Sequence, residues 1–175
     1  MRHSKKNGFV LLYAALVISA LLTIGTGLAT LARKQIVVTA ARRDAEQAFF
    51  IADNGAECAF FWDRKFFLIN RSLSVFAAND IEKASAPAPS GAVKCTGIDI
   101  VANGGPANGP WSVSTTLTTG ITSFSITDAA SGSCAQVTVN KAPGGPTGTI
   151  TTVTSVGLVK CADPTTIRRT VVSTY

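Results

Sequence analysis

Four cysteines are the residues of this chain whose type and spacing could carry chemistry. They are Cys58, Cys95, Cys134 and Cys161. Their gaps are too wide for the paired CxxC spacing of zinc ligands, and the single histidine, His3, lies close to the N-terminus. An even number of cysteines in an exported segment favours disulfide bonds. Three pairings are possible, and we favour Cys58–Cys95 with Cys134–Cys161 because each closes a moderate loop. In the chain-entropy model a loop of about 30 residues contributes on the order of 3 kcal/mol.

Catalytic chemistry is not indicated by the other polar residues. Because no histidine follows His3, neither a Ser-His-Asp nor a Cys-His arrangement is available. Asp53, Glu57 and Asp63 lie on or near one side of a predicted helix, where carboxylates are far more often solvated or ion-paired than catalytic. The sequence therefore predicts no enzyme, no cofactor or metal site and no small-molecule ligand.

The element that comes before all four cysteines is a long apolar segment. Residues 1–8 carry three basic side chains, and no residue from Phe9 to Ala32 is charged. A helix of about 20 apolar residues covers about 30 Å of hydrocarbon, so we expect residues 9–32 to cross a lipid bilayer. The basic residues ahead of this segment favour a cytoplasmic N-terminus. The expected location is therefore a single-pass inner or cytoplasmic membrane, with the bulk of the chain outside.

Three kinds of processing are compatible with this N-terminus. An ordinary secretory signal would be cut after Ala32 and would release a soluble protein, but the apolar region of such signals is usually about 7–15 residues long. An uncleaved signal anchor would tether a surface binding module that does not polymerise. A cut after Gly8 would remove the basic leader, residues 1–8, and leave the apolar segment on the protein.

The net charge of +6 does not indicate nucleic-acid binding. Three of the 16 basic residues lie in the leader, and the rest of the chain is nearly balanced by its 10 acidic residues. A Lys/Arg block with interleaved aromatic residues, the usual electrostatic signature of nucleic-acid binding, is missing from the rest of the sequence.

Helical periodicity continues beyond the apolar segment. One side of a 3.6-residue helix is apolar, and the opposite arc is charged. The apolar face comprises Ala45, Ala48, Phe49, Ala52, Ala56, Ala59 and Phe60, and the charged arc comprises Arg42, Arg43, Glu46, Asp53, Glu57 and Arg64. We therefore predict an amphipathic half-helix over residues 33–70, continuous with the apolar half, in one helix over about residues 9–67.

The remainder of the chain has the composition of a loop followed by strands. Residues 71–110 are predicted to be a loop or linker, because they include Pro-, Ser- and Gly-rich stretches. Residues 111–175 are rich in Thr, Ser and Val with apolar residues at period two, which favours an antiparallel sheet of about four strands. One face of that sheet must be buried, and the apolar side of the amphipathic helix is its natural cover. The predicted fold class is α+β.

These features together resemble the type IV pilins and pseudopilins. Lys5-Lys6-Asn7-Gly8 followed by Phe9 and an apolar run is similar to the leader junction of that family. Residues 47–57, QAFFIADNGAE, are similar to a pattern found in certain minor pilins. The resemblance covers about residues 1–63, and the rest matches only in its architecture of a long helix on an antiparallel sheet.

The resemblance implies a processing and assembly route. A prepilin peptidase would cut between Gly8 and Phe9 and methylate the new amine of Phe9. Residues 9–32 would first lie in the lipid bilayer and then pack against other pilin subunits in an extracellular filament. The implied function is a structural subunit of a type IV pilus-like filament, with a pseudopilin of a secretion system as the alternative.

One residue departs from the family pattern. Most pilins carry glutamate at the fifth position after the cut, where this chain has Tyr13. The absence of this carboxylate removes an element that pairs with a neighbouring subunit, which favours a minor, priming or tip position in the filament. Drift within the lineage of an ordinary subunit is the alternative explanation, and we give the two equal weight.

Overall fold

The computed structural model describes residues 7–70, 74–85, 91, 93–105, 109–128, 130–144, 148–163 and 167–175. Residues 1–6 of the predicted leader lie outside this part of the chain. The chain divides into two compact units, Met1–Arg42 and Arg43–Tyr175, and each is described by itself.

A single helix, α1 (Asn7–Asn70), contributes to both units. It confirms the predicted long N-terminal helix and extends it by a few residues at each end. The sequence between these bounds contains no proline, so no backbone hydrogen bond of the helix is removed.

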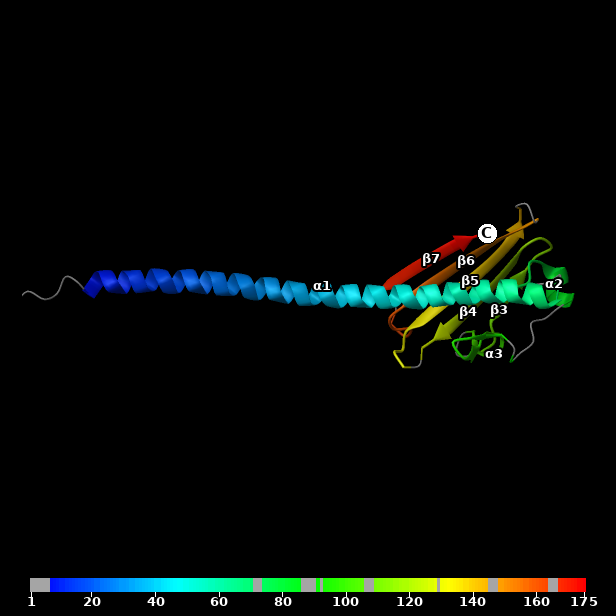
Figure 1. Ribbon diagram of the computed structural model, residues 1–175, viewed down its shortest axis with the longest axis horizontal. Helices are drawn as coiled ribbons and strands as arrows, with labels where there is room; N and C mark the ends of the chain where they lie inside the picture. The colour runs from blue at the N-terminus through cyan, green and yellow to red at the C-terminus, as the bar shows by residue number, and fades with distance from the viewer. Residues whose placement is uncertain are drawn as a thin grey trace, which may run out of the picture. The chain divides into compact units, whose positions relative to one another are not determined.

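The second unit contains a five-stranded antiparallel sheet, whereas about four strands were predicted. The strands are β3 (Ser112–Thr115), β4 (Gly120–Thr127), β5 (Cys134–Pro143), β6 (Thr149–Leu158) and β7 (Arg168–Thr174). They pair in the order β3-β4-β5-β6-β7, each with its neighbour in sequence, which makes the sheet a meander (Figure 1). The additional strand is β3, whose four residues are too few to show a clear alternation of apolar and polar side chains.

The predicted loop, residues 71–110, contains regular structure of its own. It holds α2 (Asp80–Ser85), the short strands β1 (Lys94–Cys95) and β2 (Ile98–Asp99), and α3 (Ile100–Asn103). Strands β1 and β2 pair as a hairpin, and its turn residues Thr96 and Gly97 both have positive φ values of 49° and 86°. Parts of the predicted loop, residues 71–73, 86–90, 92 and 106–108, lie outside the described residues.

The core of the second unit lies between one face of the sheet and α1 beyond Arg43 (Figure 1). The helix contributes mainly small side chains, and the sheet contributes larger ones, because alternate strand residues point inward. The buried residues include Ala48, Ala52, Ala56 and Ala59 from α1, Phe124, Ile126, Val137, Val139 and Val153 from the sheet, and Phe76, Val93 and Ile100 from the segment between them. The predicted apolar face is confirmed at these four alanines, whereas Ala45 and Phe60 are half-buried and Phe49 is 48% exposed.

Two glycines permit the close approach of α1 to the sheet. A Cβ atom on Gly157 of β6 would lie 1.9 Å from the carbonyl oxygen of Ala48. A Cβ atom on Gly55 of α1 would lie 2.6 Å from the hydroxyl of Ser155 and 2.8 Å from Ala135 Cβ. The overlap is deeper at Gly157, where the obstacle is backbone, than at Gly55, where the nearest atoms belong to side chains and lie 2.6–2.8 Å away.

This difference predicts that an alanine at Gly157 destabilises the fold more than an alanine at Gly55. Overpacking a core typically costs about 1–3 kcal/mol. We expect Gly157→Ala to lower the free energy of unfolding by at least the upper part of that range, and Gly55→Ala to cost less. Urea unfolding of the full-length chain in detergent micelles, followed by tryptophan fluorescence, measures both. Equal losses for the two variants would contradict the close contact of Gly157 with the helix backbone.

Candidate functional site

The first unit presents a continuous apolar surface. Its large hydrophobic side chains are between 41% exposed, at Val17, and 76% exposed, at Phe9. They are Phe9, Val10, Leu11, Leu12, Tyr13, Leu16, Val17, Ile18, Leu21, Leu22, Ile24, Leu28, Leu31, Ile36, Val37 and Val38. A surface of this extent is not expected to remain in contact with water.

The serine and threonine hydroxyl groups within this apolar surface are already hydrogen-bonded to the helix itself. Ser19 and Thr23 donate to carbonyl oxygens three residues earlier, and Thr26 and Thr30 donate to carbonyls three and four residues earlier, all at 2.8–3.0 Å. In hydrocarbon an unsatisfied polar group costs several kcal/mol, so these internal bonds suit a lipid or protein environment without water. Within the part of the chain that the structure describes, α1 is long and apolar enough to cross a membrane by length and composition. An 18-residue stretch of it has a mean hydropathy of 2.3.

The residues predicted for processing and assembly lie together at the start of α1. Gly8 and Phe9 belong to its first turn, and Tyr13 follows Phe9 by four residues, which places the two aromatic side chains on the same face. Tyr13 is 64% exposed. The cysteines are elsewhere, all in the second unit.

Two glycines interrupt the apolar surface at Gly25 and Gly27. A Cβ atom at either position would meet no other atom within 4 Å. Among the described residues, no close contact therefore requires glycine here, whereas close approach of a second helix would use the absence of a side chain.

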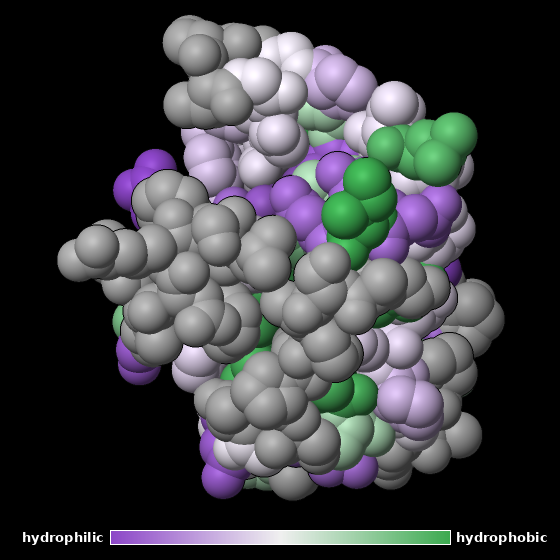
Figure 2. All heavy atoms as spheres, turned by 90° about the vertical axis from the view of Figure 1, so that its right-hand side faces the viewer, coloured by the Kyte–Doolittle hydropathy of each residue, from purple (hydrophilic) through white to green (hydrophobic). Residues whose placement is uncertain are grey.

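In the part of the second unit that the structure describes, exposed hydrophobic residues form small groups, such as Phe49 and Phe50, whose rings lie 6.2 Å apart. Ile81 and Leu117 are 70% and 79% exposed. On the face drawn in Figure 2, a small group of hydrophobic residues lies beside hydrophilic ones. The apolar residues of the first unit are thus the more extended candidate surface for assembly.

A buried polar cluster lies between α1 and the sheet in the second unit. Asp63 of α1 and Lys141 of β5 are each 7% exposed, and the Lys141 Nζ lies 2.7 Å from Asp63 Oδ1. The Tyr175 hydroxyl donates to Asp63 Oδ2 at 2.7 Å, and the Ser74 hydroxyl donates to Oδ1. The carboxylate therefore accepts from three donors, and the two buried charges neutralise each other.

Tyr175, which directly follows the edge strand β7, connects this cluster to β6. Its backbone exchanges hydrogen bonds of 2.9 and 3.0 Å with Thr151 of β6, and its ring lies 5.2 Å from that of Phe60. Burial raises the pKa of the Tyr175 phenol above its ordinary value, and the hydrogen bond to Asp63 raises it further. The phenol therefore stays protonated, and remains a donor to Asp63, well into the alkaline range.

Sequence reasoning expected Asp63 to be solvated or ion-paired on a helix surface, and it is ion-paired, but its side chain is buried. The signal that could have placed it correctly is its spacing, because Ala52, Ala56, Ala59 and Asp63 follow each other at the three- and four-residue intervals of one helix face. Lys141 likewise continues the inward alternation of β5.

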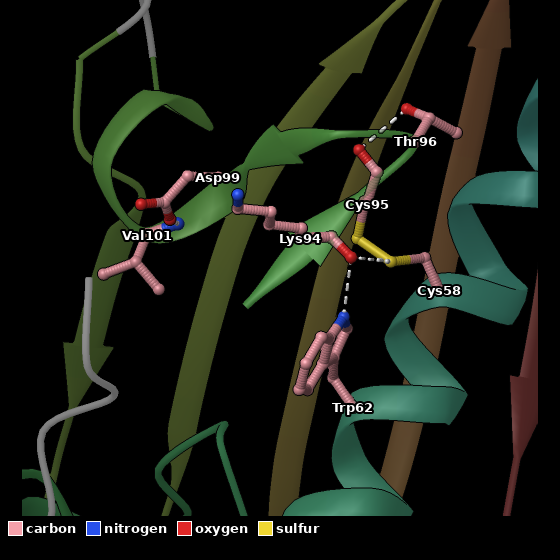
Figure 3. The surroundings of a disulfide bond; sticks show 7 residues. All are labelled: Cys58, Trp62, Lys94, Cys95, Thr96, Asp99 and Val101. Carbon is pink, nitrogen blue, oxygen red and sulfur yellow. Dashed lines mark hydrogen bonds between the residues drawn. A yellow bond between two sulfur atoms is a disulfide. The ribbon is translucent and has the colours of Figure 1, made fainter. Parts of the chain in front are cut away.

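Both disulfides of the structure are the pairings favoured from the sequence. Cys58 of α1 is bonded to Cys95 of β1, with a Cα–Cα distance of 5.8 Å, and Cys134 is bonded to Cys161 at 5.7 Å. Figure 3 shows the first disulfide joining the helix to the hairpin, beside the Trp62 side chain. Trp62 Nε1 donates to the Lys94 carbonyl at 2.9 Å, so two separate contacts attach the hairpin to α1.

Comparisons with known proteins supply no relative. Protein-family models, curated proteins and solved structures give no match to this chain. Within the part of the chain that the structure describes, no three His, Cys, Asp or Glu side chains come together in a way that could hold a metal ion.

Proposed function

We propose that this protein is a structural subunit of a type IV pilus-like filament, held in the membrane before assembly. The observation that carries the proposal is the exposed apolar surface of residues 9–32, which starts directly after Gly8. Its length matches a bilayer, and its serine and threonine hydroxyl groups need no external partner. The same surface can pack against equivalent helices, with Gly25 and Gly27 as points of close approach.

Removal of the leader is the step that makes the transfer from lipid to filament feasible. With residues 1–8 attached, the three basic side chains would have to pass into hydrocarbon, at a cost of several kcal/mol each. A prepilin peptidase acting between Gly8 and Phe9 at the cytoplasmic face removes this obstacle and leaves the helix intact. Other subunits, contacted through residues 9–32, are then the partners in the extracellular filament.

A minor, priming or tip position is favoured by Tyr13. A carboxylate at this position would require a positive partner in the apolar surroundings, and the phenol does not. A subunit without that pairing element is suited to begin a filament, where no earlier subunit has to be engaged.

The N-terminus of the mature protein tests the proposal. We expect N-terminal sequencing and mass spectrometry of the protein from its native cells to give Phe9 with a methylated amine. A mature N-terminus at Met1 would indicate an uncleaved anchor, and one at Arg33 would indicate a secreted soluble protein, and either result would overturn the proposal.

A pair of variants links processing to assembly. Gly8→Leu should block the cut, leave residues 1–8 attached and abolish incorporation into sheared filaments, as measured by immunoblotting. Ala32→Leu alters the alternative signal-peptidase site instead, and should leave both processing and incorporation unchanged.

A further inference from the structure

Two adjoining hollows lie on the sheet face that points away from α1. One has a volume of about 360 Å³ and the other about 470 Å³. Ser125 of β4 lines both, so the two hollows meet at this residue, and we refer to them together as the cleft. Each volume falls within the range of about 300–1,000 Å³ that small-molecule sites occupy.

The smaller hollow is lined by uncharged hydrogen-bonding side chains. Strand register places Ser123 opposite both Ser112 and Thr138, and Ser125 opposite Gln136. These side chains point away from α1, because the alternate residues of the same strands are buried in the core. The described side chains that line this hollow carry no charge.

The wall of the smaller hollow is held rigidly by backbone contacts. The Gly104 carbonyl accepts from the Ser125 amide at 2.6 Å and from the Ser125 hydroxyl at 3.2 Å. A Cβ atom on Gly105 would lie 1.8 Å from the Pro110 carbonyl oxygen, so this segment fits only with glycine. The cleft is therefore built by the fold rather than by loosely packed side chains.

The larger hollow adds one basic and one acidic side chain. Lys94 and Asp99 line it from the β1–β2 hairpin, and Figure 3 shows the Lys94 side chain extending toward Asp99 and away from the disulfide. The Asp99 carboxylate already accepts from the amides of Gly91, Val101 and Ala102 at 2.6–3.3 Å. Asp99 thus organises the backbone, and the net charge that the lining side chains present to a ligand is close to zero.

We propose that this cleft binds an uncharged, hydroxyl-rich oligosaccharide. Sugar hydroxyls both donate and accept hydrogen bonds, as do the serine, threonine and amide groups of the lining. A nucleic acid or sulfated polymer would require several cations, and Lys94 is the one basic side chain among the described lining residues. This inference does not depend on filament assembly.

Saturation-transfer NMR on the full-length chain in lipid nanodiscs tests the proposal. The probes are cellohexaose, maltohexaose and hexa-N-acetylchitohexaose, with hexagalacturonate as the charged counterpart. We expect saturation transfer to at least one of the three neutral hexasaccharides, and none to hexagalacturonate. Transfer to none of the neutral probes, or only to the acidic one, would overturn the proposal.

A matched pair of variants tests whether binding occurs in this cleft. Thr138→Val and Thr152→Val each remove one hydroxyl from the same sheet face, and each hydroxyl has one weak contact, at 3.3 Å to Ser123 and 3.4 Å to Thr174. Only Thr138 lines the cleft. We expect Thr138→Val to raise the Kd about 3–10-fold and Thr152→Val to leave it unchanged. Identical titrations of both variants and the unmodified chain would overturn the assignment.

Discussion

Asp63→Ala should lower the free energy of unfolding by about 3–5 kcal/mol, because it leaves the ammonium group of Lys141 buried without its counter-ion. The hydroxyls of Ser74 and Tyr175 lose their acceptor in the same step. Urea unfolding of the full-length chain in detergent micelles, followed by tryptophan fluorescence, measures this loss. Glu57→Ala, on an exposed part of the same helix, is the control and should change the free energy by less than about 0.5 kcal/mol.

A double variant separates an unpaired charge from lost packing. Asp63→Leu combined with Lys141→Met removes both charges and keeps apolar volume at both sites, so most of the stability should return. Recovery would show that the single variant is destabilised by the isolated ammonium group. If the double variant were as unstable as Asp63→Ala, the ion pair would not be the source of the loss, and the argument for the cluster would fail.

Asp63 and the alanines on the same face of α1 show which features of the helix could be predicted from the sequence. Helical spacing located the buried stripe of α1, and the same spacing includes Asp63. Its partners, however, come from β5 and from Tyr175, which is 112 residues away in sequence. Periodicity along a single segment says which face is buried, but it does not say which strand end meets that face. Carboxylates are placed on the surface by default, and a pairing that overrides this default depends on tertiary contacts.

The sheet illustrates a second limit. The strands β4 to β7 were recognisable because apolar residues alternate along them, whereas β3 has half-exposed and exposed residues only. The polar cleft could not be predicted from the sequence for the same reason. Its strand residues have the composition of ordinary solvent-facing positions, and they are Ser123, Ser125, Gln136 and Thr138. Only the register of β4 against β5, together with the position of the Gly104 segment, brings them into one hollow.

The Cys58–Cys95 disulfide is expected to have the second large effect on stability. It closes a loop over a sequence separation of 37 residues, and removal of a native disulfide from a small exported domain typically costs about 2–5 kcal/mol. Replacing both cysteines by alanine avoids an unpaired thiol and should lower the free energy of unfolding within that range. The Cys134–Cys161 pair, with a separation of 27, should cost a similar amount when replaced in the same way.

The emission of Trp62 distinguishes the loss of Cys58–Cys95 from the loss of Cys134–Cys161, although the two losses have similar effects on global stability. Trp62 lies one helical turn from Cys58 and donates to the Lys94 carbonyl of the hairpin that this disulfide attaches to α1. Loss of Cys58–Cys95 should therefore free the hairpin, hydrate the indole and shift its emission to longer wavelength in the folded state. Loss of Cys134–Cys161 acts at the start of β5 and should leave the emission unchanged. An equal red shift in both variants, or none in either, would mean that the disulfide does not hold the hairpin against the helix. The cleft would then have to keep its shape through the contacts of Gly104 and Asp99 alone.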